Sequence, residues 1–143
     1  MFGTGAEILF NIGKVVCFTG ETFKQIGTEY HASQTSVKFI QDMFGPAKVI
    51  VVGGVHESPF IGHASTIVNE ENFIPIAPVA SVKDFAVKSM RSSTWRRSYI
   101  STLDDIIDIN PEATFWIRTP SPASILFGLR CLKKGKTVID LGA

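Results

Sequence analysis

The chain has 143 residues, 45% of them hydrophobic and 19% charged, with a formal net charge of +1. This balance is ordinary for one globular domain, and it excludes the strongly basic character of most nucleic-acid-binding domains. No run approaches the roughly 20 apolar residues that a membrane-spanning helix requires. The N-terminus lacks the basic start of a signal peptide, so a cytoplasmic location is expected.

In the first half of the chain, short apolar runs that end at glycine predict buried strands, and apolar residues three and four positions apart predict a helix. The predicted elements are a strand at residues 15–19, a loop at 21–30, a helix at 33–44 and a second strand at 49–52. Gly45 ends the helix. Residues 55–72 are expected to be irregular. Because prolines 75 and 78 cannot donate to a central ladder, a strand at 73–79 is expected at a sheet edge.

In the second half, the same patterns predict helices at residues 82–90, 102–110 and 121–134 and strands at residues 114–117 and 137–141. Residues 91–97 are expected to form a connection. Thr102 and Asp105 have the spacing of a capping box. Ser121 is a predicted N-cap, followed by proline in the first turn. The buried face of this helix is expected to contain Ile125, Leu129 and Leu132.

Strands that alternate with amphipathic helices predict a single α/β domain, a three-layer Rossmann-like parallel sheet with helices on both faces. Ligands of such sheets bind beyond the carboxyl ends of the strands. The candidate substrate-binding residues therefore lie in the loops after the strands: Gly20, Glu21, Gly27, Glu29, Tyr30, His31, Arg118 and Ser121. Among these, His31 and Glu29 are suited to orienting a hydroxyl or transferring a proton, with solvated or capping roles as the alternative.

An anion is a further candidate ligand, because the helix that starts at Ser121 has free backbone N–H groups beside Arg118. No metal site is expected, since His56, Glu57 and His63 do not have the spacing of a zinc-binding HExxH helix. No cofactor motif follows the glycine pair after the second strand. The two cysteines, Cys17 and Cys131, are expected to be buried reduced thiols.

Residues 83–97 form a locally basic segment in a chain that is otherwise nearly neutral. Five basic residues and one acidic residue surround Trp95 there. Basic side chains beside an exposed aromatic ring are suited to anionic lipid headgroups or a phosphorylated acceptor, and would place the protein at the inner face of the membrane. The alternative is a solvated connection in which Trp95 packs into the core.

Two stretches carry a resemblance to a known family. The first is VVCFTGETFKQIGTEYHAS with the later FIQDMFGPAKVIVVG, a strand and glycine-containing loop that feed a helix and strand. The second is ATFWIRTPSPASILFGLRCLKKGKTVIDLGA, with an Arg-x-Pro-Ser turn between strand and helix. Together they resemble the N-terminal domain of B-type, two-Rossmann-domain retaining glycosyltransferases of bacterial polysaccharide and lipopolysaccharide synthesis. The tight glycine pair that some members carry after the first strand is absent here.

The resemblance implies that this chain is the acceptor-binding half of a larger enzyme and is inactive alone. In that family the C-terminal domain binds the nucleotide-sugar, so no donor or cofactor is expected to bind mainly here. The implied partners are an acceptor glycan or lipid-linked sugar and the C-terminal domain. A homodimer is a further expectation, because a domain separated from its partner exposes apolar surface.

Two alternatives remain open from the sequence. The tail GKTVIDLGA also resembles the first motif of S-adenosylmethionine-dependent methyltransferases, an acidic strand end before a glycine turn. On that alternative the chain is the region that precedes a methyltransferase core. The other alternative is a stand-alone, non-catalytic binding module.

Overall fold

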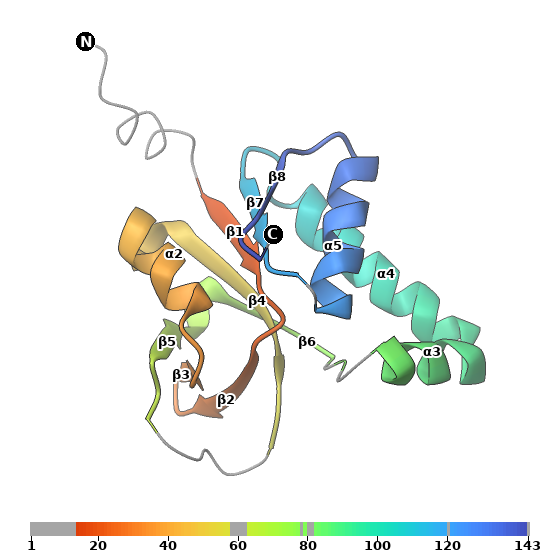
Figure 1. The fold of residues 1–143 in the computed structure, drawn as a ribbon, viewed down its shortest axis with the longest axis horizontal. Coiled ribbons are helices and arrows are strands. Elements are labelled where there is room, and N and C mark those ends of the chain that lie inside the picture. The colour runs from red at the N-terminus through yellow and green to blue at the C-terminus, as the bar shows by residue number, and fades with distance from the viewer. Residues whose placement is uncertain (1–13, 58–62, 78, 80–81, 120, 143) are drawn as a thin grey trace.

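The computed structural model describes residues 14–57, 63–77, 79, 82–119 and 121–142, and the chain within them is a mixed α/β fold (Figure 1). Eight strands form one mixed sheet: β1 Val15–Phe18, β2 Thr22–Ile26, β3 Glu29–Ala32, β4 Val49–Val55, β5 Thr66–Asn69, β6 Phe73–Ile76, β7 Thr114–Ile117 and β8 Val138–Asp140. Four α-helices accompany it: α2 Ser36–Phe44, α3 Val82–Arg91, α4 Ser93–Asp108 and α5 Pro122–Lys133.

Five of the strands form a wholly parallel part, in the order β6-β4-β1-β7-β8. The chain moves from β1 to one side, through β4 and β6, and then returns to the other side for β7 and β8. The strand order therefore reverses at β1. The predicted parallel sheet is confirmed for these strands. The predicted edge position of Pro75 is confirmed as well, because β6 pairs with β4 alone among the described strands.

The other three strands form an antiparallel part that the sequence analysis did not predict. β2 continues beyond β1 along the same side of β4 and pairs with β4 in parallel, with Thr22 opposite Gly54; β3 and β5 then add in antiparallel pairing. The predicted loop at residues 21–30 was therefore wrong. So was the prediction that 55–72 is irregular, since β4 ends at Val55 and β5 lies within that range; residues 58–62 lie outside the description.

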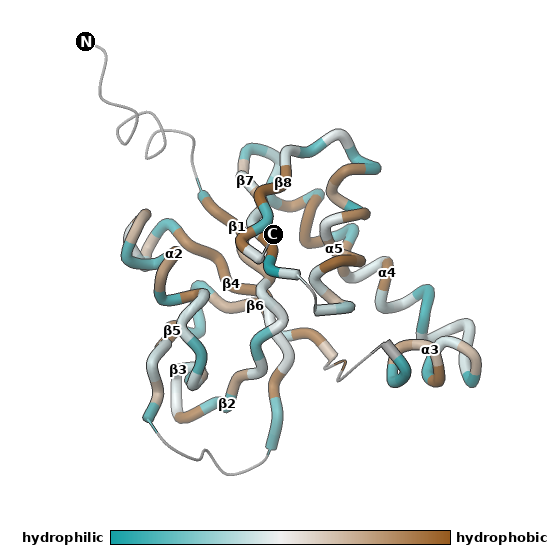
Figure 2. The backbone as a smooth tube through the Cα atoms, in the orientation of Figure 1, coloured by the Kyte–Doolittle hydropathy of each residue, from teal (hydrophilic) through white to brown (hydrophobic). Residues whose placement is uncertain are grey.

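Alternating side chains of the central strand build two cores on opposite faces of the sheet. Val15 and Cys17 of β1 pack with the buried side chains of α2, and Val16 and Phe18 pack with those of α4 and α5. Figure 2, coloured by residue hydropathy, shows that apolar residues are concentrated in the central strands. The predicted buried residues of α2 and α4 are confirmed: Val37, Ile40, Phe44, Leu103, Ile106 and Ile107.

Helix α4 begins nine residues earlier than predicted. The Ser92 hydroxyl accepts a hydrogen bond of 3.1 Å from the backbone N–H of Trp95, so it caps the helix in what was expected to be a connection. The proposed capping box was wrong, because Thr102 lies inside the helix and its hydroxyl donates to the Ser98 carbonyl. No described helix is long and apolar enough to cross a membrane.

Helix α5 buries a different face from the one that was predicted. Its buried residues are small or aromatic: Ala123, Ser124, Phe127, Gly128 and Cys131. A Cβ added at Gly128 would lie 2.8 Å from Cδ1 of Ile117, so the glycine allows α5 to approach β7 closely. The predicted apolar face points outward instead, with exposed fractions of 38% for Ile125, 58% for Leu129 and 60% for Leu132. We call these three side chains the α5 stripe.

Candidate functional site

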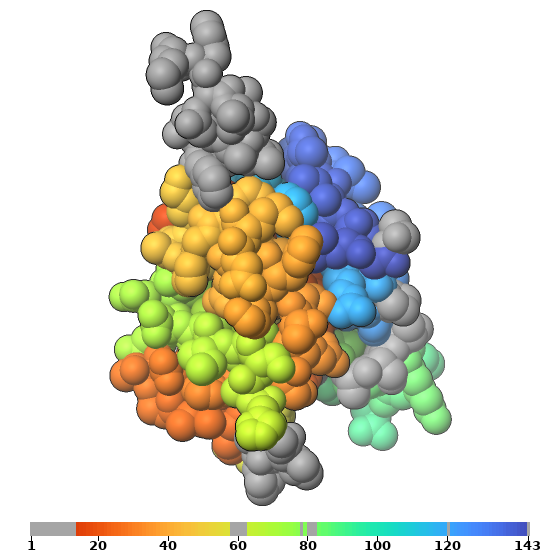
Figure 3. Space-filling model, turned by 60° about the vertical axis from the view of Figure 1, so that its left-hand side comes forward, coloured from red at the N-terminus to blue at the C-terminus, as the bar shows by residue number. Residues whose placement is uncertain are grey.

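The carboxyl ends of β7 and β8 meet the N-terminus of α2 at an open pocket of about 610 Å³. We call it the Arg118 pocket; it is lined by Thr35, Ser36, Phe39, Arg118, Thr119, Leu141 and Gly142. Figure 3 shows α2, in gold, and the end of the chain after β8, in blue, on one face of the molecule. Arg118 and Thr119 follow β7, which pairs with β1, the strand at which the order reverses; no residue of β1 itself lines the pocket.

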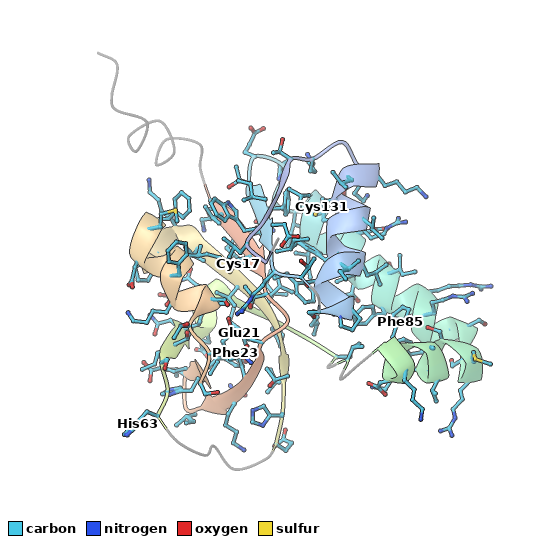
Figure 4. All side chains as sticks on the ribbon, in the orientation of Figure 1. Cys17, Glu21, Phe23, His63, Phe85 and Cys131 are labelled. Atoms are coloured by element: carbon cyan, nitrogen blue, oxygen red, sulfur yellow. The ribbon has the colours of Figure 1, made fainter. Side chains whose placement is uncertain are left out.

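Glu21 is a buried acid beneath this pocket, with 2% of its surface exposed, near the centre of the molecule in Figure 4. Its Oε1 accepts a hydrogen bond of 3.1 Å from the backbone N–H of Val37, in the first turn of α2. The carboxyl thus caps α2 from inside, and Thr35 at the N-cap position makes no side-chain cap. Oε2 has no hydrogen-bond partner among the described residues.

Burial raises the pKa of Glu21 above its usual range. Hydrogen bonds from Val37, Thr19 and Ser36 and the positive charge of Arg118 lower the pKa and offset part of this rise. The protonation state of this carboxyl therefore depends on its burial more than on any one partner.

Arg118 follows β7 directly and is an exposed cation of the pocket. Its guanidinium donates a hydrogen bond to Oγ of Ser36, which connects the end of β7 to the start of α2. It makes no ion pair with a carboxylate of the described residues, so its charge is available to a ligand. A second, smaller pocket of about 260 Å³ shares Arg118 and Thr119 with the first and adds Thr19, Gly20, Gln34 and Ser121.

The loops around Arg118 are held by close contacts. Gly20 has a φ of +80°, and a Cβ at this position would overlap the Ser121 side chain, so only glycine fits against the start of α5. The Ser124 hydroxyl shares its hydrogen between the carbonyls of Arg118 and Ser121, at 2.6 and 2.9 Å. Asp140 at the end of β8 accepts from the Thr119 hydroxyl at 2.9 Å, the Thr119 N–H at 3.2 Å and the Gly142 N–H at 2.8 Å.

The structure brings four of the eight predicted site residues together and separates them from the other four. Gly20, Glu21, Arg118 and Ser121 lie around the reversal point at the carboxyl ends of β1 and β7. The remaining four lie on the antiparallel part: Gly27, Glu29, Tyr30 and His31.

Those four residues have local structural contacts. Gly27, with a φ of +62°, forms the turn between β2 and β3. Tyr30 is buried, and its ring stacks on Phe73 with centroids 3.9 Å apart. Nε2 of His31 lies 3.3 Å from Oε1 of Glu29. None of them lines the Arg118 pocket.

Four pocket residues were missed by the sequence analysis: Thr35, Ser36, Phe39 and Leu141. The other two, Thr119 and Gly142, lie in the loops that follow the predicted strands. A usable signal existed for Thr35 and Ser36, which begin the helix that follows the first strand. Helix starts of this kind face the carboxyl ends of parallel strands. No signal of that kind marked Phe39, which is 56% exposed on α2.

The histidine, cysteine and acidic side chains of the described residues can be compared with the expectations for metal ligands and thiols. No group of three or more His, Cys, Asp or Glu side chains there is arranged to hold a metal ion. Cys17 and Cys131 are free and buried in different cores, and burial raises the pKa of Cys131 to about 12. Both thiols are therefore poor nucleophiles near neutral pH.

Two more cavities continue the site along the sheet edge. A narrow one of about 20 Å³ shares Gly20 and Ser121 with the smaller Arg118-side pocket and reaches Tyr99. It shares Ile76, Ala77 and Tyr99 with a cavity of about 190 Å³, which we call the Trp95 pocket and which also contains Trp95, Ser98 and Thr102. The polar pocket at Arg118 and the aromatic pocket at Trp95 thus lie at opposite ends of one row of cavities.

Glu21→Gln is expected to change the pH dependence of stability. An acid whose pKa is raised on folding stabilises the fold below its unfolded pKa, near 4.5, and this stabilisation is lost as pH rises through the folded pKa. The free energy of unfolding of the wild type should therefore fall, relative to the Gln variant, as pH rises from about 4.5 through the raised pKa of the folded state. Urea unfolding of both proteins at pH 4 and pH 8 measures the difference.

Glu71→Gln is the matched control, since Glu71 is an exposed carboxyl on the surface. Asp104 and Asp140, whose pKa values are lowered by their hydrogen bonds, also contribute to the pH dependence of stability. Their contributions are the same in all three proteins and cancel when the proteins are compared. An identical pH dependence for Glu21→Gln and wild type would show that the carboxyl is not buried as described.

No known protein family, curated protein or solved structure has a significant match to this chain.

Proposed function

We propose that this chain is the acceptor-binding, N-terminal Rossmann-like domain of a nucleotide-sugar-dependent glycosyltransferase of polysaccharide or glycolipid synthesis. The observation that carries the proposal is the position of the Arg118 pocket. The parallel strands in sheet order are the third, second, first, fourth and fifth of their kind in the chain. This is the order of the first five strands of a doubly wound dinucleotide-binding fold, whose ligands bind where the order reverses.

The chemistry of the pocket supports a sugar ligand with a negative charge. Thr35 and Ser36 supply hydroxyls for sugar hydroxyls, Thr119 supplies a hydroxyl oxygen that can accept while its hydrogen is donated to Asp140, and Arg118 supplies a cation for a phosphate or carboxylate. Phe39 supplies an exposed ring against which the apolar face of a sugar can pack. A few polar groups beside one aromatic surface are typical of small-molecule sites.

In this proposal the residues of the chain bind and orient the acceptor, and the transfer needs a second domain. Glu21 fixes the start of α2, so that Ser36 and Arg118 stay within hydrogen-bond reach. The Asp140 hydrogen bonds hold Thr119 at the pocket. The nucleotide-sugar binds the second domain, which packs on this one; the exposed α5 stripe supports such a partner, or a second copy of the chain.

The methyltransferase alternative has less support. It assigns a ligand-facing role to the acid at the end of the last strand, yet the Asp140 carboxylate already accepts three hydrogen bonds from Thr119 and Gly142. A stand-alone binding module would use the same Arg118 pocket, and it differs from a transferase half in that adding a donor-binding second domain produces no transfer.

Arg118→Gln is expected to weaken binding of glucose 1-phosphate about 10- to 150-fold, because a hydrogen bond to a charged group contributes about 1.5–3 kcal/mol. Amide chemical-shift changes in ¹⁵N-labelled protein measure the dissociation constant and locate the ligand. The expected changes cluster at Ser36, Phe39 and Thr119. Arg97→Gln, on distant α4, is the control and should leave the dissociation constant unchanged.

Amide chemical-shift changes that cluster elsewhere would refute the assignment of the pocket. So would equal losses of affinity for glucose 1-phosphate in Arg118→Gln and Arg97→Gln. The purified chain should also neither transfer nor hydrolyse a nucleotide-sugar. Measurable turnover by the 143 residues alone would contradict the proposed division of labour between two domains.

A further inference from the structure

Charge is unevenly distributed over this chain. Residues 83–97 contain five basic residues and one acidic residue, which gives +4, whereas the whole chain has a net charge of +1. The remainder of the chain therefore has a net charge of −3. A cationic surface on an otherwise slightly acidic protein indicates an anionic partner at that surface.

The structure places most of this charge in solvent on α3 and the start of α4. Four basic side chains are exposed and make no ion pair with described residues: Lys83, Arg91, Arg96 and Arg97. We call them the cationic face. The fifth, Lys88, pairs with Asp84 at 3.1 Å and lies 5.7 Å from the centre of the Trp95 ring.

Apolar side chains are exposed among these cations. Met90 is 86% exposed and Val87 is 37% exposed. Lys83, Val87, Met90 and Arg91 recur at three- and four-residue spacing, so they lie along one side of α3. A helix that presents apolar and basic residues to solvent together is typical of interfacial helices at membranes.

The exposed side of α3 is held outward by an aromatic cluster on its inner side. The Phe85 ring lies 5.6 Å from that of Trp95 and 5.9 Å from that of Tyr99, both edge-on, and Trp95 stacks on Tyr99 at 5.2 Å. Figure 4 shows Phe85 where α3 meets α4. Because this inner side fixes α3 to α4, Met90 and Val87 are not free to turn into the core.

We propose that the cationic face, with Met90 and Val87, docks the protein peripherally on an anionic lipid bilayer. Basic residues near a membrane surface are attracted by its negative potential, and apolar side chains between them insert at the headgroup boundary. Nucleic acid matches the charge but leaves Met90 and Val87 without apolar contacts. The bilayer matches both features, and this inference does not depend on the proposed transferase function.

Cosedimentation with vesicles tests the proposal. The probes are vesicles of phosphatidylcholine alone and of phosphatidylcholine with 30% phosphatidylglycerol, a composition chosen to be about as anionic as a cytoplasmic leaflet. Wild-type protein is expected to bind the anionic vesicles at least tenfold more tightly than the neutral ones, and to be released by salt. Equal binding to both compositions, or none to either, overturns the proposal.

Two sets of variants separate the cationic face from net charge. Arg91→Glu with Arg97→Glu should lower the partition coefficient on anionic vesicles at least tenfold. Lys14→Glu with Lys133→Glu changes the net charge equally at exposed sites away from α3, and should change partitioning less than threefold. Equal losses in both double variants would show that only net charge matters, and would overturn the docking site.

Met90→Ser tests the apolar contribution without any charge change. It should lower partitioning several-fold while leaving the salt dependence unchanged, and an unaltered partition coefficient would exclude insertion of this side chain. A short DNA duplex is the competing polyanion; binding of DNA as tight as that of the anionic vesicles, with equal effects of Met90→Ser on both, overturns the lipid assignment. Arg118→Gln should leave vesicle binding unchanged, so failure of this proposal is distinguishable from failure of the proposed function.

Discussion

Replacement of Gly20 by alanine is expected to lower the free energy of unfolding by about 2–5 kcal/mol. Alanine at a φ of +80° costs about 1–2 kcal/mol, and the overlap of its Cβ with Ser121 adds about 1–3 kcal/mol of strain. The bend between β1 and β2 would have to move away from α5 to relieve it. Urea unfolding followed by circular dichroism measures the loss.

Gly27→Ala is the matched control for this prediction. Gly27 has a similar φ of +62°, but an added Cβ meets nothing within 4 Å, so the variant should lose only the conformational cost of about 1 kcal/mol. Ser121→Gly combined with Gly20→Ala should recover most of the difference between the two. Equal losses at positions 20 and 27 would mean that the contact with Ser121 has no energetic weight.

Phe127→Ala is expected to lower the free energy of unfolding by about 3–5 kcal/mol, the usual range for removing a fully buried aromatic side chain. The Phe127 ring has no exposed surface and lies 5.2 Å from the ring of Phe18 and 6.0 Å from that of Phe115. It therefore fixes α5 to β1 and β7, the strands that are followed by Gly20 and Arg118. Thermal unfolding in a calorimeter measures the change.

A second readout connects Phe127 to the site. Because α5 begins directly after the Arg118 loop, loosening of the helix should also weaken binding of glucose 1-phosphate. Phe39→Ala removes a ring of the same size that is 56% exposed, so it should change stability by less than about 0.5 kcal/mol. A Phe127→Ala protein as stable as wild type would contradict the packing described here.

Elements whose buried residues follow a local sequence pattern could be predicted from the sequence. β1, β7 and α2 follow from continuous apolar runs or regular helical spacing, and the structure confirms them. The hairpin of β2 and β3 could not be found in this way. Its strands alternate buried Phe23 and Tyr30 with polar residues, and they are stabilised by pairing with β4 and β5, which are distant in the sequence.

The orientation of α5 was mispredicted for a related reason. Its larger apolar side chains form a regular stripe, but the sheet selects the side on which Gly128 permits close approach. Which face is buried depends on the shape of the neighbouring strand as well as on hydrophobicity. That information lies in the contact between Gly128 of α5 and Ile117 of β7, and the apolar spacing of the helix alone does not contain it.

The rule that ligands bind at the carboxyl ends of parallel strands led to eight predicted residues, four of which lie around the reversal point, and of these only Arg118 lines the Arg118 pocket itself. Gly20, Glu21, Arg118 and Ser121 were found in this way, although the burial of Glu21 was not, because charged residues are rarely found inside. Thr119 lines the pocket because Asp140 holds it there, and that contact depends on the register between β7 and β8. Such long-range pairing is invisible to local patterns.

Strand β4 pairs with three neighbours: β1 and β2 along one side, and β6 along the other. Among the described strands, β4 is the one whose ladder pairing joins the parallel part, which carries the pocket, to the antiparallel part. Separation of β4 from the sheet would therefore break both parts in one event. The hairpin of β2 and β3, which the sequence analysis did not predict, is therefore part of the cooperative unit that keeps the Arg118 pocket assembled. Its own side chains do not line that pocket.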